Sequence, residues 1–68
     1  MTDTYELEKV IRQSGLTKKQ CASELGLSEQ SFLLKLNNKN EFKASEIDKL
    51  CQILHLQDNS LFFAKNVN

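Results

Sequence analysis

One cysteine and the only histidine of the chain lie four residues apart, a spacing that suits two metal ligands on one face of a helix. These residues are Cys51 and His55. A structural zinc site requires four ligands, and no second pair of ligands follows nearby. Free cysteines are more often small buried apolar residues. We therefore expect no metal site and no cofactor, with Cys21 and Cys51 as reduced thiols.

Nucleophilic side chains do not combine into a catalytic group either. Ser14, Ser23 or a cysteine would need a general base that a third side chain orients. The only histidine, His55, lies near the expected end of a helix, and the sequence indicates no third side chain that would orient it as a base. A chain of 68 residues also buries only about 60% of the surface that its unfolded state exposes, which leaves little room for a deep pocket. We predict that the protein is not an enzyme and takes no small-molecule substrate.

Charge is balanced over the whole chain but not along it. Nine basic and nine acidic residues give a formal net charge of zero, which argues against general binding of polyanions. Residues 16–43 nevertheless hold five lysines against three glutamates, while each flank carries a small acidic excess. The central segment is therefore the candidate surface for an anionic partner, and an ordinary solvated surface is the alternative.

Composition indicates a small folded domain. The 40% of hydrophobic and 26% of charged residues are typical of globular proteins and exclude general disorder. We expect residues 1–68 to form a single domain. No apolar run approaches the roughly 20 residues that span a bilayer, so we expect no membrane partner. No leader-like segment opens the chain, and we therefore predict a cytoplasmic protein.

Helical spacing of apolar residues predicts an all-α fold. The stripes at i, i+3 and i+4 are Leu7, Val10 and Ile11; Cys21, Ala22 and Leu25; Phe32, Leu33 and Leu36; and Ile47, Leu50, Cys51 and Leu54. The helix of the last stripe begins after either Lys43 or Ser45. A fifth short helical turn, capped by Asp58 or Asn59, would hold Leu61, Phe62 and Phe63. We therefore expect five helices.

Capping residues mark the ends of the first helices. Gly15 permits the left-handed conformation that ends a helix. Thr17 and Gln20 have the spacing of a capping box, in which each side chain satisfies a backbone N–H group of the other residue. Ser28 is a good N-cap for the helix that follows it.

Residues 16–39 form the segment that is most informative about function. A short capped helix is followed by the turn Leu25-Gly26-Leu27-Ser28 and by a second short helix. Gly26 permits the left-handed conformation that a tight reversal requires. Ala22 lies where the two helices would cross, and its small side chain permits their close approach. This is the helix-turn-helix pattern, in which the second helix is presented to the DNA major groove.

The segment resembles the phage Cro and repressor class of helix-turn-helix proteins. The matching positions are Leu16-Thr17, Ala22, Leu25-Gly26-Leu27-Ser28, Phe32, Lys35-Leu36-Asn37 and Lys39. A narrower likeness to small Cro-like regulators of phages and prophages continues through Glu41-Phe42, Glu46-Ile47, Leu50, Ile53-Leu54 and Phe62-Phe63-Ala64. The resemblance implies a compact five-helix lambda-repressor-like domain. It also implies a transcriptional regulator that occupies double-stranded operator DNA as a weak or DNA-assisted homodimer.

Roles transferred from that family, position by position, imply a DNA-binding surface. Its members are Thr17, Lys18, Ser28, Glu29, Gln30, Ser31, Leu34, Lys35, Asn37, Asn38 and Lys39. Residues 29–31 would face base edges, and Leu34 would face a thymine methyl group. Lys18, Ser28 and the turn 37–39 would hold phosphates.

Three features depart from the family pattern. Asn38 stands where the family has a turn glycine, and Glu29 places a negative charge beside the duplex. Leu33 and Leu34 are adjacent on a helix whose outer face should be polar. We expect Leu33 in the core, and Leu34 is open between groove contact and protein contact. The alternative function is a helix-turn-helix fold used for protein–protein contact, as an antirepressor or a small dimerising regulator.

The apolar residues near the end of the chain supply the candidate dimer interface. Regulators of this class bind two half-sites about one helical turn apart, and the resemblance therefore implies a symmetric dimer. We assign Leu61 and Phe63 to the dimer interface and expect Phe62 in the core. The alternative is that all three residues cover the core beneath the first helix.

Overall fold

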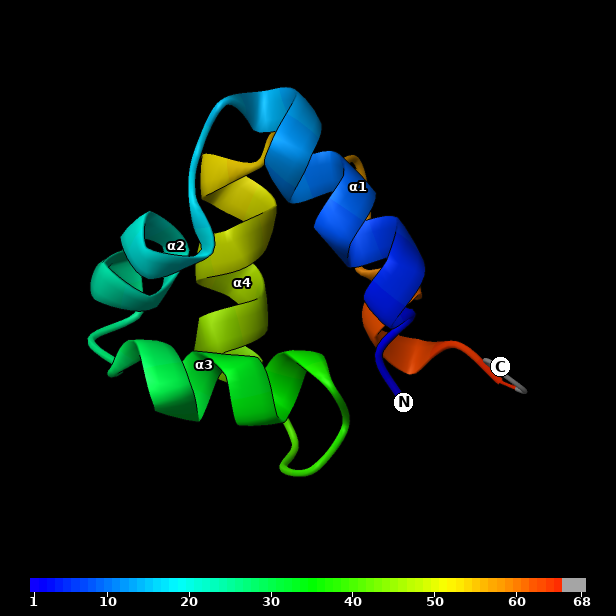
Figure 1. The fold of residues 1–68 in the computed structure, drawn as a ribbon. Coiled ribbons are helices and arrows are strands. Elements are labelled where there is room, and N and C mark those ends of the chain that lie inside the picture. Colours follow the sequence, from blue (N-terminus) through cyan, green and yellow to red (C-terminus); the bar gives the residue numbers. More distant parts are fainter. Residues whose placement is uncertain (66–68) are drawn as a thin grey trace.

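Four α-helices and one short 3₁₀ helix make up the fold, and residues 1–65, which the computed structural model describes, contain no strand (Figure 1). The elements are α1 (Thr4–Ser14), α2 (Lys18–Glu24), α3 (Glu29–Leu36), α4 (Ala44–Ile53) and the 3₁₀ helix η1 (Ser60–Phe63). The all-α prediction is confirmed. We expected five helices with a short turn as the fifth; the described part has four α-helices, and the last segment spans four residues and forms a 3₁₀ helix. Residues 66–68 of the predicted domain lie outside the described residues.

The ends of the first three helices fall where capping chemistry predicts them. The Thr17 hydroxyl accepts from the Gln20 backbone N–H at 3.0 Å, and the Gln20 side chain accepts from the Thr17 N–H at 2.8 Å. Gly15 ends α1 with a φ of 84°, in the left-handed region. Ser28 caps α3 by accepting from the Ser31 N–H at 3.1 Å. These local predictions are confirmed because capping depends only on residues within one turn.

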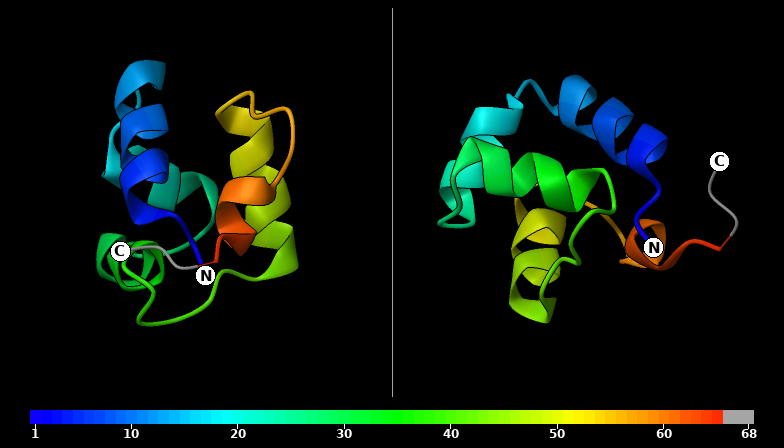
Figure 2. Two further views of the ribbon diagram at one scale, coloured as in Figure 1. Left: turned by 90° about the vertical axis from the view of Figure 1, so that its right-hand side faces the viewer. Right: turned by 60° about the horizontal axis from the view of Figure 1, so that its bottom comes forward.

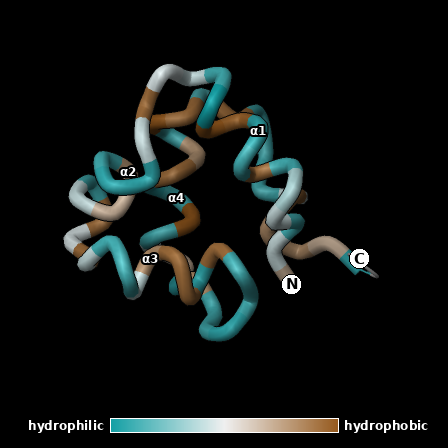
Figure 3. Tube along the Cα trace, viewed as in Figure 1, coloured by the Kyte–Doolittle hydropathy of each residue, from teal (hydrophilic) through white to brown (hydrophobic). Residues whose placement is uncertain are grey.

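All five elements contribute to a single hydrophobic core. Its buried members are Leu7, Ile11, Cys21, Ala22, Phe32, Leu36, Ile47, Leu50, Leu54 and Phe62. Phe42, in the loop before α4, joins Phe32 to Phe62, with edge-to-face ring centroids 5.8 and 5.6 Å apart. Hydrophobic stretches recur between hydrophilic ones along the helical trace, as expected where one face of a helix is buried (Figure 3).

The helices divide into two groups in space. α2 and α3 lie on one side of the molecule, and α1 and η1 lie on the other (Figures 1 and 2). The N-terminal residues run beside the segment of η1: the Asp3 N–H donates to the Leu61 carbonyl at 2.7 Å, and the Ala64 N–H donates to the Met1 carbonyl at 2.8 Å. No helix among residues 1–65 has both the length and the apolar character to span a membrane.

Candidate nucleic-acid interface

A tight turn joins α2 to α3 and sets their crossing. Gly26 has a φ of 72°, a conformation that glycine adopts without strain. The Gly26 N–H donates to the Ser23 carbonyl at 3.0 Å, and the Leu27 N–H donates to the Ala22 carbonyl at 2.9 Å. Ala22 is buried in the core cluster, as expected of a residue between two closely packed helices. The turn therefore holds α3 against α2 in one orientation.

The outer face of α3 carries a continuous exposed stripe. Gln30, Leu34 and Asn37 follow one another at i, i+4 and i+7, and all three are exposed. Glu29 is exposed beside them, and Ser31 is half-buried. The structure thus brings together the residues that the sequence assigns to base contacts, and it leaves them open to a partner.

Two exposed hydroxyl groups lie at the starts of α2 and α3. Thr17 and Ser28 are exposed, and each uses its oxygen to accept the capping hydrogen bond of its own helix. Each hydroxyl keeps its hydrogen as a donor for a further acceptor such as a phosphate oxygen. Both residues can therefore cap a helix and contact an anion at the same time.

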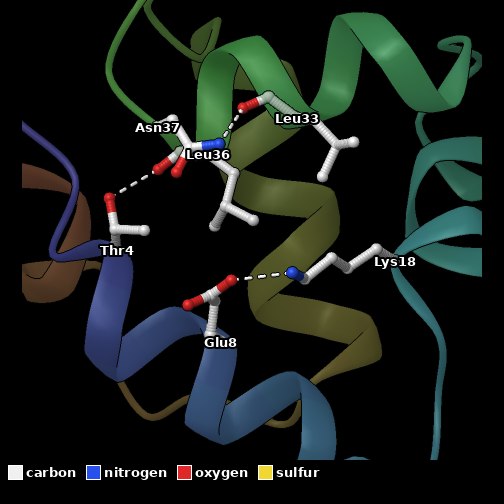
Figure 4. Close-up of polar contacts among 6 residues, drawn as sticks. All are labelled: Thr4, Glu8, Lys18, Leu33, Leu36 and Asn37. Atoms are coloured by element: carbon white, nitrogen blue, oxygen red, sulfur yellow. Dashed lines mark hydrogen bonds and ion pairs between the residues drawn. The ribbon is translucent and has the colours of Figure 1, made fainter.

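Lys18 does not stand free on the surface. Its Nζ donates to Glu8 Oε2 of α1 at 2.7 Å (Figure 4). The two side chains remain 38% and 37% exposed, so that water reaches the pair. An external anion at Lys18 would therefore compete with Glu8 for the ammonium group.

Lys35 lies between α3 and α4 and is paired with Glu46. Its Nζ donates to both oxygens of Glu46 in α4, at 2.7 and 2.9 Å, and the two side chains are only 11% and 9% exposed. We expected Lys35 to contact DNA, but its position places the ammonium group between α3 and α4. The physical reason is that the α3 face bearing Phe32 and Leu36 packs inward and carries Lys35 to its edge.

Glu46 has two roles in this contact. Besides pairing with Lys35, it accepts from the Lys43 backbone N–H at 2.8 Å and so completes the first turn of α4. Lys43 is therefore the N-cap residue, which resolves the two starts left open by the sequence. Burial raises the pKa of Glu46, but the hydrogen bonds from Lys35 and Lys43 outweigh it, and the pKa is lowered overall.

The turn after α3 is held by its asparagines. Asn37 Nδ2 donates to the Leu33 carbonyl at 2.9 Å. Asn38 has a φ of 63°, and its side chain accepts from the Thr2 N–H at 2.8 Å and donates to the Thr2 carbonyl at 2.9 Å. The Asn38 amide, which we expected at a phosphate, is thus occupied within the protein. All three residues of the expected phosphate-holding turn, 37–39, are exposed, but the side-chain amides of Asn37 and Asn38 bond within the protein.

A further contact fixes α1 to the end of α3. Thr4 Oγ1 donates to the Leu36 carbonyl at 2.6 Å (Figure 4). Leu36 is in the last turn of α3, where carbonyl groups have no partner within the helix. Because Glu8 follows Thr4 by one turn, α1 is bonded to α3 at its start and to α2 one turn later.

The two adjacent leucines of α3 face different surroundings, as their spacing suggests. Leu33 is half-buried and packs against the core, in agreement with the prediction for it. Leu34 is 40% exposed on the outer stripe. It is therefore available to whichever partner this face binds.

The last aromatic residues point in different directions. Phe62 is buried, as predicted, whereas Phe63 is 60% exposed. Leu61 is half-buried and packs against the core. Phe63 and the exposed Met1 line a pocket of about 200 Å³ whose inner wall includes Phe42. Of the two residues that we assigned to a dimer contact, Phe63 is thus exposed to solvent, whereas Leu61 mainly packs against the core.

The two thiols are free. Cys21 is buried and Cys51 is half-buried. Burial raises the pKa of both, helped by Glu24 near Cys21 and by Asp48 and Asp58 near Cys51. Residues 1–65 contain no cluster of three or more His, Cys, Asp or Glu side chains that could hold a metal ion.

Sequence reasoning assigned no role to Glu8, Thr2 or the side chain of Glu46. Each is paired with a predicted interface residue that is ten or more positions away: Lys18, Asn38 and Lys35. Periodicity and capping report only on neighbours within a turn or two, so no signal in the sequence identified these partners.

Comparison with known families complements this geometry. Neither the curated proteins nor the solved structures contain a match to the chain. The resemblance to Cro and repressor proteins therefore stays a prediction. A family model described as "Protein of unknown function (DUF739)" matches residues 3–65, which include all four α-helices and η1. The chain belongs to the DUF739 family.

Proposed function

We propose that this DUF739 protein is a sequence-specific double-stranded DNA-binding regulator that acts in the cytoplasm. In this proposal α2 and α3 are a helix-turn-helix of the Cro and repressor type, within a lambda-repressor-like fold. The observation that carries the proposal is the exposed stripe of Gln30, Leu34 and Asn37 on a short helix fixed against α2 by the Gly26 turn. A short helix that is held rigidly and exposes one face is the form that enters a major groove.

The chemistry of the stripe suits base recognition. The Gln30 amide has the donor and acceptor that pair with adenine N7 and N6, and the Glu29 carboxylate accepts from cytosine N4. Leu34 offers an apolar contact for a thymine methyl group. Thr17 and Ser28, at the starts of α2 and α3, and Lys39, in the turn after α3, are exposed and would hold phosphates.

Assembly belongs to the same proposal. A protein that covers two half-sites must present two copies of α3 in the same direction, which a two-fold symmetric contact achieves. The exposed Phe63, beside the pocket that it lines with Met1, is the candidate contact for a weak or DNA-assisted homodimer.

Protein contact through the same fold is the second candidate function. The exposed Leu34 favours it, because an apolar side chain on the outer face of α3 suits a protein partner as well as a thymine methyl group. The net charge of zero favours it too, since DNA-binding domains are usually basic. In that case the protein would act as an antirepressor or a small dimerising regulator.

Selection from a library of random duplexes tests the proposal directly. We expect one enriched sequence whose affinity falls steeply with salt, because each phosphate contact contributes about 0.9 to the slope of log K against log salt. Gln30→Ala should cost about 1–3 kcal/mol on that duplex and relax preference at one base pair. Gln13→Ala, which removes an exposed glutamine of α1, is the matched control and should change neither the affinity for that duplex nor the base preference.

Two results would decide against DNA binding. One is a library that yields no enriched sequence while the protein is folded. The other is an affinity that does not respond to salt. Recovery of a protein that binds wild type but not Leu34→Glu would then support the protein-contact function.

A further inference from the structure

The junction of α1 and α2 brings one carboxylate and two cations together. Lys18 Nζ of α2 donates to Glu8 of α1 at 2.7 Å (Figure 4). Arg12 follows Glu8 by four residues, so both side chains project from the same side of α1. All three residues line one open pocket of about 290 Å³, together with Ile11 and Leu16.

This junction has one cation more than its carboxylate neutralises. Arg12 is exposed, and within residues 1–65 it takes part in no ion pair. Lys18 is half-exposed, and Glu8 is the one partner of its ammonium group among residues 1–65. Because exposed ion pairs contribute only about 0.2–1 kcal/mol, Lys18 can leave Glu8 for a stronger anion at little cost.

Arg12 is placed to compensate for that exchange. A glutamate followed by a cation four residues later is the favourable order for an ion pair along a helix. If Lys18 leaves, the guanidinium of Arg12 can reach Glu8 from one turn further along α1 and keep the carboxylate neutralised. No buried charge is left behind in either arrangement, since both pairs face solvent.

We propose that Glu8 tunes DNA affinity by holding Lys18 in the free protein, and that Arg12 replaces Lys18 as the partner of Glu8 on DNA. This inference rests on the proposed function, since the anion that Lys18 turns to is a phosphodiester of the duplex. Thr17, whose hydroxyl keeps a hydrogen to donate, directly precedes Lys18 and can contact the same phosphate. Glu8 is thus a positioning residue that acts through Lys18.

The test is a titration of the selected duplex with Glu8→Gln, measured by fluorescence anisotropy at several salt concentrations. We expect binding about two- to fivefold tighter than wild type, because Lys18 no longer has to leave an ion pair. The salt dependence should also become steeper, since a free Lys18 contacts phosphate from the outset.

Glu6→Gln is the matched control. Glu6 lies on the same helix, has a side chain 40% exposed against 37% for Glu8, and pairs with a lysine at 3.5 Å. It projects from a different side of α1, because two residues correspond to about 200° of rotation. A gain for Glu6→Gln equal to that for Glu8→Gln would mean that only overall charge matters, and would overturn the inference.

A double-mutant cycle locates the effect. In a Lys18→Ala background the Glu8→Gln gain should vanish, whereas a gain that persists there would contradict the role of Lys18. Arg12→Gln should weaken binding in the wild-type background and have little effect beside Glu8→Gln. Equal losses in both backgrounds would assign Arg12 to direct phosphate contact and overturn its exchange role.

The outcomes separate this inference from the proposed function. If wild type selects and binds a duplex but Glu8→Gln behaves as wild type, the proposed function stands and the counter-ion role fails. If neither wild type nor Glu8→Gln binds any duplex, both fail. Circular dichroism of each variant shows whether the fold is retained.

Discussion

At the scale of single residues, Asn38 shows how one side chain can replace a glycine. The left-handed conformation costs a residue with a Cβ atom roughly 1–2 kcal/mol. Asn38, with a φ of 63°, recovers this cost through two hydrogen bonds to the backbone of Thr2, at 2.8 and 2.9 Å. The asparagine that stands where Cro-like proteins have a turn glycine therefore has a structural reason, in a partner 36 residues away.

We predict that Asn38→Gly lowers the free energy of unfolding although it removes the backbone strain. The two lost hydrogen bonds are worth about 1–3 kcal/mol together. The strain relieved is smaller than the roughly 1–2 kcal/mol of most residues with a Cβ atom, because asparagine tolerates the left-handed conformation. Asn38→Ala should cost more, about 2–3 kcal/mol, because it loses the bonds and keeps the strain. Asn40→Ala, in the same loop and without a side-chain hydrogen bond in the described part, is the control for urea denaturation. A more stable Asn38→Gly would contradict this account.

The two thiols should react at different rates. Cys21 has no exposed surface, and burial raises its pKa, so labelling should require opening of the fold. Cys51 is half-buried and should react first, although its raised pKa slows it relative to a free thiol. A thiol reagent applied to Cys21→Ser and to Cys51→Ser separates the two. Rapid labelling of the native Cys51→Ser variant would mean that Cys21 is not in the core.

At the scale of the elements, α3 is held from three sides. The Gly26 turn fixes it to α2, Thr4 bonds to its last turn, and Lys35 bonds to Glu46 of α4. The outer stripe is free because all these contacts use the other faces of the helix. The orientation of the candidate interface thus depends on ties to every other α-helix.

The Lys35–Glu46 ion pair should make the stability of the fold depend on pH in the acidic range. The pKa of Glu46 is lower in the folded state than in the unfolded state. The ionised Glu46 therefore stabilises the fold fully above the pKa of an unfolded glutamate, about 4.3, and this stabilisation is lost as the pH falls through the folded-state pKa. We expect Glu46→Gln to destabilise the protein near neutral pH and to flatten the acid side of its stability curve. Glu29→Gln, on the exposed stripe, is the control for thermal unfolding between pH 3 and 7. Parallel curves for wild type and Glu46→Gln would show that the tie contributes nothing.

At the scale of the whole molecule, the N-terminal residues meet the segment after η1 beside the turn after α3. Met1 and Thr2 bond to Ala64 and Asn38, so the N-terminal segment lies between η1 and that turn. The apolar surface of Met1 and Phe63 faces outward at this place. A dimer formed here would set the separation of the two copies of α3.

Phe63→Ala should therefore affect self-association, whereas Phe62→Ala should affect the stability of the monomer. Phe63→Ala should weaken self-association and cooperative DNA binding while the monomer stays folded, because Phe63 is mostly exposed. Phe62→Ala should lower the free energy of unfolding by about 3–5 kcal/mol, since it opens a cavity beside Phe42. Sedimentation with and without a duplex carrying half-sites about 34 Å apart measures the first effect. A wild-type protein that stays monomeric on that duplex at high concentration would rule out the paired-half-site arrangement.

The sequence alone determined the features that depend on neighbours along the chain. The caps at Thr17 and Ser28, the left-handed Gly15 and the buried stripe of Phe32 and Leu36 are all as expected. Each follows from groups within one or two turns, where helical geometry leaves few alternatives. The exposed stripe on α3 follows in the same way, since it lies opposite the buried one.

Only the tertiary structure decided which charges are free. Lys18 and Lys35 look alike in the sequence, yet Lys18 forms a solvent-exposed ion pair with Glu8 and Lys35 forms a mostly buried one with Glu46. The partner of Asn38 and the split between Phe62 and Phe63 were decided in the same way. The physical reason is that an ion pair or a hydrogen bond needs atoms within about 3 Å, and only packing of distant segments brings those atoms together.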